Sequence, residues 1–270
     1  MPHRPAHRID MNQGITQQRE SEEGLSNPSA VETAASQAPC TQCGSHALCL
    51  FEGLGKEDIA RLDGLIESRR KLKRQQTLYR AGDPFHALYA VCSGFFKTEI
   101  LLEDGREQVT GIHMTGDILG MDGIGTGAHA CHAVALDSSQ VCVIPFDELE
   151  RFSREVPGLQ RNFHKMMSYR LVRDQGLMTL LGTMSAEERM AAFLLTLSQR
   201  FTSRGFSPAE FHLRMTREEI GQCLGLKLET VSRTLSRMQE DGLITVQQKH
   251  IRILDAKRLK KIFAHPLFPR

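Results

Sequence analysis

The sequence predicts an α+β fold in which an antiparallel β-domain precedes one long helix and a helix-turn-helix with a wing. Between residues 76 and 146, short β-rich runs are separated by glycine turns at regular intervals, which is typical of a sandwich or barrel. Residues 147–184 contain almost no glycine or proline after Pro157 and Gly158, and their apolar residues recur at helical spacing. Two further helical patterns then meet at Gly225.

Length and composition narrow the class of protein. At 270 residues the chain is about twice the usual domain length, so we expect two domains with separate cores. It has no run of about 18 apolar residues and no basic-then-apolar N-terminus, so we expect a cytoplasmic protein without a transmembrane helix or signal peptide. The motifs G-x-S-x-G, H-E-x-x-H and the P-loop are missing, so no such enzyme chemistry is predicted.

The N-terminal part carries the most distinctive local pattern. Residues 1–39 are rich in Gln, Ser, Glu, Pro and Ala without a sustained period, so they are interpreted as a disordered tail. Cys40, Cys43 and Cys49 follow with C-x2-C-x5-C spacing. In a reducing compartment, the seven cysteines are expected to be free thiols or metal ligands rather than disulfides. The three clustered thiols therefore predict a site for a metal or for redox chemistry.

Five strands are expected in the β-domain, after a short amphipathic helix within residues 54–66. Asp104-Gly105 is a strong hairpin signal, so the strands on either side of it are expected to pair. The expected strands cover residues 77–81, 87–92, 95–102, 107–114 and 140–144.

One stripe of the long helix has the spacing of a coiled-coil seam. Its members are Met167, Leu171, Asp174, Met178 and Leu181, at steps of 4, 3, 4 and 3 residues. In a parallel homodimer, two Asp174 carboxylates would approach each other and oppose pairing unless another interaction offset their repulsion. The helix has several apolar faces, so the alternative that Asp174 faces water stays open.

The C-terminal part predicts a winged helix-turn-helix. After a helix over residues 186–201, Thr216 and Glu219 form a capping box that opens a helix through Leu224, and Gly225 ends it. A second helix is expected over residues 228–241. Alternating apolar residues on either side of residues 247–250 predict a two-stranded wing.

Charge divides the chain in two. Residues 1–150 contain 13 Lys and Arg against 21 Asp and Glu, a balance of −8, whereas residues 151–270 contain 21 against 11, a balance of +10. A basic half favours a polyanion such as nucleic acid, because phosphate neutralisation releases counterions. The alternative is a solvated basic face.

Three residues near the start of the second helix of this motif are candidates for DNA contact. Glu229, Ser232 and Arg233 lie at i, i+3 and i+4, so they share one face. Arginine matches the acceptors of guanine and glutamate accepts from cytosine, so Glu229 and Arg233 together suit one G·C pair. The alternative is an ordinary exposed ion pair within the helix.

Four motifs resemble those of a known family. They are T-L-Y-R-A-G-D at 77–83, L-Y-A-V-C-S-G at 88–94, G-D-I-L-G at 116–120 and E-T-V-S-R at 229–233. These motifs resemble the cyclic-AMP receptor superfamily of bacterial transcription regulators. With the N-terminal cysteines included, the chain is similar to its oxygen-responsive FNR branch (fumarate and nitrate reduction regulator). The resemblance covers about residues 40–255.

The resemblance implies a domain order. Residues 40–150 would form a cluster-binding segment and a jelly-roll (double-stranded β-helix) sensory domain, and residues 151–185 a dimerisation helix. Residues 186–270 would form the winged helix-turn-helix DNA-binding domain. The implied function is an oxygen-sensing regulator whose homodimer binds palindromic TTGAT-type sites and contacts RNA polymerase through the loop at residues 101–107.

The resemblance also implies a [4Fe-4S] cluster, which oxygen would destroy. Cys40, Cys43 and Cys49 would supply three thiolates and a distant cysteine the fourth. Cys142 lies where the family pattern has that ligand. Cys131 is the competing choice, and local sequence does not decide between them. The remaining two cysteines, Cys92 and Cys223, are interpreted as buried thiols.

In this interpretation the cluster favours the dimer by offsetting repulsion at Asp174, with Leu171 and Met178 as its apolar neighbours in the seam.

Lys227 departs from the branch, which commonly has a hydroxyl residue before the recognition helix. An N-cap acceptor is lost there, although a phosphate contact can be gained.

Residues 107–150 contain no Lys or Arg to pair with a cyclic phosphate, so a cyclic nucleotide is not expected as a ligand.

Three alternatives use parts of the same sequence. A zinc-stapled or thiol-redox-responsive DNA-binding regulator of the same fold would use the same thiols without an iron-sulfur cluster. A C-x2-C oxidoreductase would have its motif at a helix start in a βαβ setting, and no such pattern precedes Cys40. A haem or other small-ligand sensor on this scaffold is disfavoured by the three N-terminal cysteines.

Overall fold

The computed structural model describes Cys40, Cys43 and residues 49–262. They belong to one compact unit, Val31–Arg270. The tail predicted over residues 1–39 lies outside the described residues, as do residues 41–42, 44–48 and 263–270. No helix in the described part of the chain is long and apolar enough to cross a membrane.

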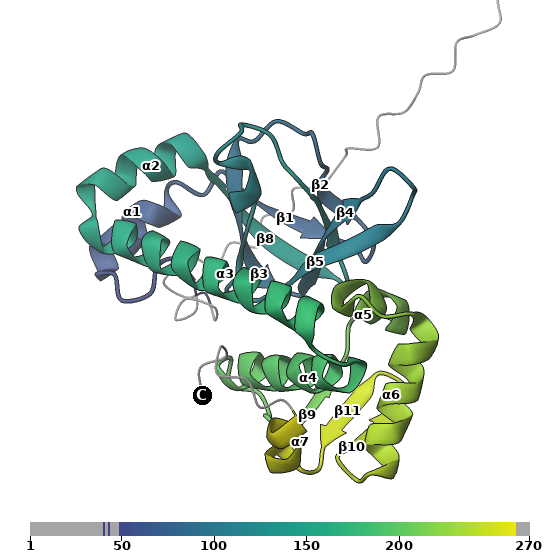
Figure 1. The fold of residues 1–270 in the computed structure, drawn as a ribbon. Helices are drawn as coiled ribbons and strands as arrows, with labels where there is room; N and C mark the ends of the chain where they lie inside the picture. The colour runs from purple at the N-terminus through teal and green to yellow at the C-terminus, as the bar shows by residue number, and fades with distance from the viewer. Residues whose placement is uncertain (1–39, 41–42, 44–48, 263–270) are drawn as a thin grey trace, which may run out of the picture. The chain divides into compact units, whose positions relative to one another are not determined.

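Two four-stranded antiparallel sheets form the β-domain (Figure 1). Their strand orders are β1-β8-β3-β6 and β2-β7-β4-β5, which confirms the predicted jelly-roll class. A short helix, α1 (Lys56–Asp63), precedes them as expected. The strands are β1 (Ser68–Leu72), β2 (Thr77–Tyr79), β3 (Ala87–Ser93), β4 (Phe95–Leu101), β5 (Glu107–Met114), β6 (Ile118–Leu119), β7 (His132–Ala135) and β8 (Ser139–Pro145), with a 3₁₀ turn, η3 (Met121–Gly123), after β6.

The five predicted strands correspond to β2, β3, β4, β5 and β8. Gly105 has φ +82°, so the residue that signalled the β4–β5 hairpin does adopt a left-handed conformation. The strands β1, β6 and β7 were not predicted. β1 lies at a sheet edge and contains Arg69, Arg70 and Lys71, so its sequence lacks the apolar alternation of a strand.

The long helical region consists of two helices, so the prediction of one continuous helix over residues 147–184 is wrong. α2 (Phe146–Glu155) and α3 (Pro157–Thr183) are separated at Val156, which has φ −118° and ψ 90°. Proline disfavours helical backbone in the residue before it and suits the first turn of a helix. Pro157 therefore ends α2 and begins α3.

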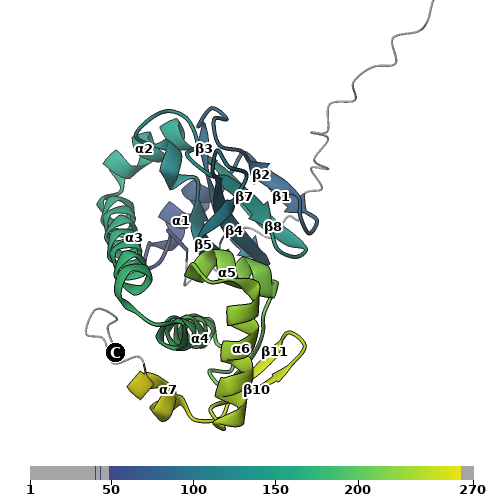
Figure 2. The ribbon, with the colours of Figure 1, turned by 45° about the vertical axis from the view of Figure 1, so that its right-hand side comes forward.

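The C-terminal part is a winged helix-turn-helix (Figure 2). Helix α4 (Ala186–Thr202) leads to α5 (Arg217–Leu224) and α6 (Leu228–Glu240). The capping box of Thr216 and Glu219 is present, and Gly225 has φ +63°, so both predicted helix-boundary signals are confirmed. The predicted wing strands β10 (Ile244–Gln247) and β11 (His250–Ile253) pair, and β9 (Glu210–His212) adds a third strand that was not predicted. A short helix, α7 (Ala256–Ile262), follows.

Two charged clusters connect the β-domain to the C-terminal helices. On α4 and its C-terminal flank, Arg200 and Arg204 both pair with Asp117, the latter at 2.9 Å. Lys97 of β4 lies between two carboxylates, 2.7 Å from Glu99 and 3.3 Å from Glu219 of α5. Burial would lower the pKa of Lys97, but the carboxylates of Glu99 and Glu219 outweigh it and raise this pKa. Lys97 is therefore charged and holds α5 against the β-domain.

Candidate functional site

Four of the cysteines share one apolar core between α1, β3, β8 and α2. Cys40 and Cys142 are buried, and Cys49 and Cys92 pack against the same core as partly buried residues. The apolar residues around them include Leu88 and Ile144, both almost fully buried. Cys43 is half-buried, and its backbone N–H donates to the carbonyl of Cys40 at 3.2 Å. The fold therefore brings the N-terminal thiols to the strand that carries Cys142.

Sheet register places Cys142 beside three named neighbours. On β8 it lies opposite Ala90 of β3 and opposite Arg69 of β1. The pairing of β3 with β8 shifts between Val91 and Ser93, so Cys92 lies in an irregularity of the strand. The Sγ atoms of Cys92 and Cys142 are 2.9 Å apart.

A carboxylate and a guanidinium connect the cysteine segment to the sheet. The backbone N–H of Cys40 donates to Asp63 Oδ1 at 3.0 Å, and Arg69 donates to the same oxygen at 3.0 Å. Asp63 thus holds Cys40 at the end of α1, next to the strand that faces Cys142. The positive charge of Arg69 reaches both Cys40 and Cys142.

The local environment gives these thiols different acidities. The hydrogen bond from Cys92 and the charge of Arg69 outweigh burial and lower the pKa of Cys142 to about 7. The same hydrogen bond, together with burial, raises the pKa of Cys92. Burial raises the pKa of Cys49 to about 12, and burial with the Asp63 carboxylate raises that of Cys40. Of Cys40, Cys49, Cys92 and Cys142, the thiol of Cys142 thus carries negative charge most readily near neutral pH.

The donor chemistry of this core suits a thiolate-bound group, since soft sulfur ligands select iron-sulfur clusters and zinc. Three described thiols, those of Cys40, Cys49 and Cys142, come from the same core. Within Cys40, Cys43 and residues 49–262, no group of three or more His, Cys, Asp or Glu is arranged to hold a metal ion. The cysteines therefore fit a thiolate-bound metal group by their chemistry and by their place in the fold, although the described side chains are not arranged around a metal position.

The other cysteines lie elsewhere. Cys131 belongs to a second core of the β-domain, where its thiol is 3.4 Å from Asp122 Oδ2. Cys223 is buried in the core around α4 and α5, as expected. The interpretation of Cys92 as a buried thiol is wrong, because Cys92 is partly exposed and contacts Cys142. Local sequence gave no sign of this contact, since the two residues are separated by 50 positions.

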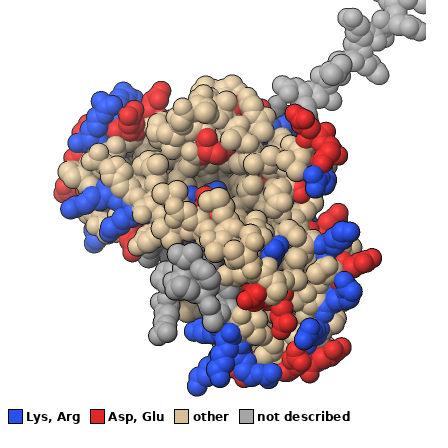
Figure 3. Space-filling model, in the orientation of Figure 1, with Lys and Arg blue, Asp and Glu red and all other residues tan. Residues whose placement is uncertain are grey.

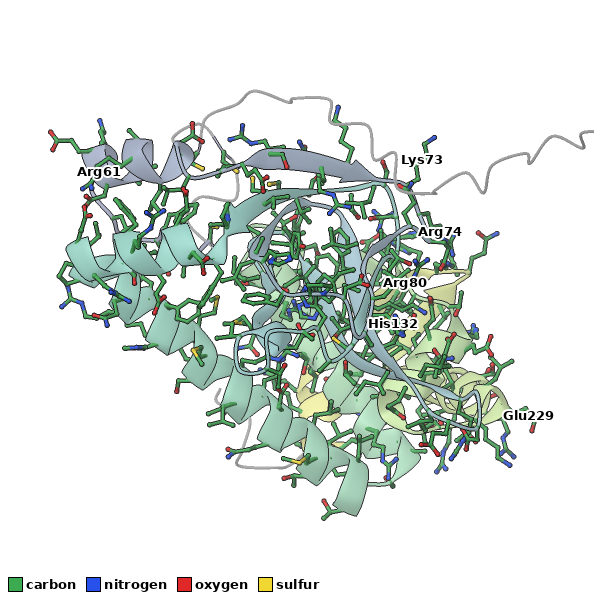
Figure 4. All side chains as sticks on the ribbon, turned by 90° about the horizontal axis from the view of Figure 1, so that it is seen from above. Arg61, Lys73, Arg74, Arg80, His132 and Glu229 are labelled. Atoms are coloured by element: carbon green, nitrogen blue, oxygen red, sulfur yellow. The ribbon has the colours of Figure 1, made fainter. Side chains whose placement is uncertain are left out.

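The candidate DNA-contacting residues lie on the outer face of α6 and just before it. Val231, Leu235 and Met238 face the core, which leaves Lys227, Glu229 and Arg233 exposed and Ser232 half-buried. Glu229 projects away from the molecule in Figure 4. In the part of the chain that the structure describes, neither Glu229 nor Arg233 forms an ion pair. The pair predicted as an alternative use of these residues is therefore not formed.

The N-terminus of α6 has no side-chain cap. Lys227 occupies the N-cap position in extended conformation, and its side chain accepts no hydrogen bond there. The first amides of α6 and the Lys227 ammonium thus lie at the same exposed end of the helix. Figure 3 shows further Lys and Arg side chains gathered over α7, at the bottom of that view.

Helix α3 presents an apolar face to solvent. Met167, Leu171 and Met178 are exposed by 46%, 61% and 66%. Asp174 of the same predicted seam pairs with Arg170, whose Nε is 3.0 Å from Asp174 Oδ2. This partner lies one turn earlier in the helix and was not predicted.

Comparisons with known proteins agree with this architecture. Residues 69–155 match the cyclic nucleotide-binding domain family and residues 188–262 the Crp-like helix-turn-helix domain family. The fumarate and nitrate reduction regulatory protein of Escherichia coli is 42% identical over 226 residues, 84% of this chain and 90% of that protein. The fumarate nitrate reduction regulatory protein of Klebsiella oxytoca is 43% identical over 223 residues, 83% of this chain and 89% of that protein. The structure of FixK2 from Bradyrhizobium japonicum superposes with a TM-score of 0.67 at 29% identity, covering 72% of this chain and 96% of that one.

A β-roll domain, a long helix with an exposed apolar face and a winged helix-turn-helix together define the CRP class of transcription regulators. Within that class, this chain belongs to the family of the fumarate and nitrate reduction regulatory proteins, the FNR branch. Both the predicted fold class and the predicted family are thereby confirmed.

Proposed function

We propose that this FNR-type regulator senses oxygen through a [4Fe-4S] cluster held by Cys40, Cys43, Cys49 and Cys142. The observation that carries this proposal is the core that Cys142 shares with Cys40 and Cys49, from which it is distant in sequence. Cys131 packs in a different core against Asp122, which favours Cys142 as the fourth ligand. When bound, the cluster would supply an oxygen-reactive centre.

The protein's own residues prepare the site for a thiolate-bound group. Arg69 lowers the free-energy cost of a negative charge on Cys142, and the sulfur of Cys92 shares a hydrogen bond with that of Cys142. Asp63 binds both Cys40 and Arg69, which keeps the N-terminal thiols beside the β1–β8 pair. Apolar side chains of α1 and α2 pack around these thiols.

Dimerisation is proposed to follow from the exposed apolar face of α3, with Leu171 and Met178 in the seam around Asp174. Arg170 offsets part of the Asp174 charge, so the proposed repulsion between the two Asp174 carboxylates is weaker than that of two unpaired carboxylates. The test is Asp174→Ala in the apoprotein, followed by analytical ultracentrifugation and operator binding. A variant that stays monomeric and binds operator no better than wild-type apoprotein would contradict the role of Asp174.

We propose that this regulator is cytoplasmic. Its homodimer would place two α6 helices on a palindromic TTGAT-type site. Glu229, Ser232 and Arg233 are proposed to read base edges, and Lys227 to contact phosphate. Support comes from the exposure of Glu229 and Arg233 on one face of α6, without an ion pair to each other, and from the exposure of Lys227 just before the helix. The β4–β5 loop, residues 101–107, is proposed to contact RNA polymerase. Its Asp104 and Arg106 pair at 2.7 Å and shape this exposed loop.

We further propose that the β-domain binds no cyclic nucleotide, although its fold family is named for that ligand. The interior is filled by side chains: the His129 ring stacks on Tyr79 with centroids 3.7 Å apart, and Asp122 accepts hydrogen bonds from Tyr79 and from the amide of Ala130. Residues 107–150 also offer no Lys or Arg to a phosphate. Calorimetry with cyclic AMP is expected to detect no binding.

The decisive experiment is anaerobic purification of wild type, Cys142→Ser and Cys131→Ser, with visible spectra and counts of iron and acid-labile sulfide. The wild type and Cys131→Ser are expected to contain about four irons and four sulfides per chain. Cys142→Ser is expected to lose them. A colourless, zinc-containing wild type would support the zinc-stapled alternative, and loss only in Cys131→Ser would make Cys131 the fourth ligand.

A further inference from the structure

Four cysteines share the apolar core between α1, β3, β8 and α2, and Cys92 is the one of them that the proposed cluster does not use. Its Sγ atom is 2.9 Å from that of Cys142, and the two sulfur atoms share a hydrogen bond. Both residues lie on central strands of one sheet, β3 and β8, which neighbour each other in the strand order. The scaffold thus holds the two thiols together whatever the N-terminal segment does.

The irregular pairing of β3 with β8 explains why these two side chains meet. Ala90 is the direct partner of Cys142, and Cys92 is two residues further along the same face of β3. The register shift between Val91 and Ser93 displaces Cys92 from the regular ladder. Because the backbone of a bulge is locally freed from ladder hydrogen bonds, a small shift there can close the remaining distance between the sulfurs.

We propose that Cys92 and Cys142 form a reversible disulfide when the chain lacks its cluster, and that this bond blocks Cys142 from acting as a ligand. The bond is a modification site on the apoprotein, and its effect on ligation rests on the proposed function. Cys131 lies in a separate core, so it does not compete for Cys142. Cys92 itself is partly exposed, which gives a small oxidant or reductant access to the pair.

The chemistry balances with a peroxide as the oxidant. The sulfur of Cys142 attacks one peroxide oxygen, the O–O bond breaks, and one water leaves a sulfenic acid on Cys142. The sulfur of Cys92 then attacks that sulfur, the S–O bond breaks, and a second water leaves with the Cys92 proton. Two thiols lose two electrons in total, and one peroxide becomes two waters. A dithiol reductant reverses the reaction by exchange.

Mass spectrometry of the full-length apoprotein tests this bond directly. Reduced apoprotein is exposed to hydrogen peroxide, alkylated without reduction and digested with trypsin. Cleavage after Arg80 and Lys97 releases Cys92 in residues 81–97, while cleavage after Arg106 and Arg151 releases Cys142 in residues 107–151. The wild type is expected to yield these two peptides linked, with the loss of two hydrogens, until dithiothreitol is added.

Two variants make the assignment specific. Residues 107–151 also contain Cys131, so Cys131→Ser is the matched control and is expected to keep the link in full. Cys92→Ser is expected to reduce it to background and to leave a sulfenic acid on Cys142 that dimedone labels. A wild type that gives the dimedone adduct on Cys142 with the peptides unlinked, or a bond from Cys142 to another cysteine, would overturn the proposal. Circular dichroism of each variant shows whether it is folded.

Reconstitution separates this proposal from the proposed function. Peroxide-treated wild type is expected to take up iron and sulfide only after dithiothreitol, whereas reduced wild type takes them up directly. If reduced wild type fails to take them up, the cluster proposal fails while the disulfide result stands. If oxidised and linked wild type takes them up unchanged, the proposed block of ligation is refuted.

Discussion

The charge of Lys97 is expected to be essential for stability, because replacing it leaves two carboxylates buried without a cation. Lys97, Glu99 and Glu219 are exposed by only 5%, 8% and 6%. Lys97→Met keeps the apolar stem of the side chain but removes the ammonium that lies 2.7 Å and 3.3 Å from the two carboxylates. Breaking a buried ion pair by removing one partner costs about 3–5 kcal/mol. Urea unfolding of the full chain at neutral pH, followed by circular dichroism, measures this loss.

Two controls separate the buried charge from a general effect of losing a surface cation. Arg151→Met removes an exposed pair with Glu148 on α2 and is expected to cost less than about 1 kcal/mol. Adding Glu99→Gln and Glu219→Gln to Lys97→Met is expected to recover part of the loss, because no unpaired charge remains buried. If Lys97→Met unfolds within about 1 kcal/mol of wild type, the triad does not carry the connection between β4 and α5.

Three further predictions follow from the described side chains. Burial, aided by neighbouring arginines, lowers the pKa of His113, so below about pH 6.5 the unfolded chain binds a proton that the folded chain does not. The free energy of unfolding is therefore expected to fall on acidification by up to about 1.4 kcal/mol per pH unit. His113→Gln should flatten the dependence of the urea midpoint on pH between pH 7.5 and 5.5. If the variant keeps the wild-type slope of midpoint against pH, the assignment to His113 is wrong. Gly94→Ala should destabilise the β-domain far more than Gly105→Ala. Both glycines have positive φ, so the backbone cost of a side chain is similar at the two positions. A Cβ at Gly94 would lie 2.1 Å from Ser139 Oγ, whereas a Cβ at Gly105 would meet nothing within 4 Å. Equal melting temperatures of these two variants would refute the steric argument. Arg233→Ala is expected to weaken operator binding by about 1–3 kcal/mol in fluorescence anisotropy, with binding to unrelated duplex unchanged.

Local signals in the sequence were enough for the elements that short-range physics controls. Thr216 and Glu219 close a capping box between residues three apart, and Gly225 and Gly105 take left-handed conformations that other residues disfavour. Pro157 carried a local signal too, since a proline ends the helix before it. The prediction of one continuous helix did not use that signal, although the rule was sufficient to place the break at Val156.

The edge and short strands could not be predicted from pattern alone. β1 carries three basic residues in five, and β6 has only two residues, so neither shows the alternation that marks a strand. Their place in the sheets depends on partners from distant parts of the chain, β8 and β3. A strand is defined by its neighbour's hydrogen bonds as well as by its own residues.

By itself, the sequence determined the fold class, the order of the domains, the family resemblance and the type of residue available for a thiolate site. The tertiary structure alone decided which residues from distant parts of the chain meet. It places Cys92 against Cys142, Asp122 against Cys131, and Lys97 against Glu219. The physical reason is the range of the interactions. Helix caps and turns depend on residues a few positions apart, whereas burial, ion pairing and thiol contact depend on strands and helices that only the folded chain brings together.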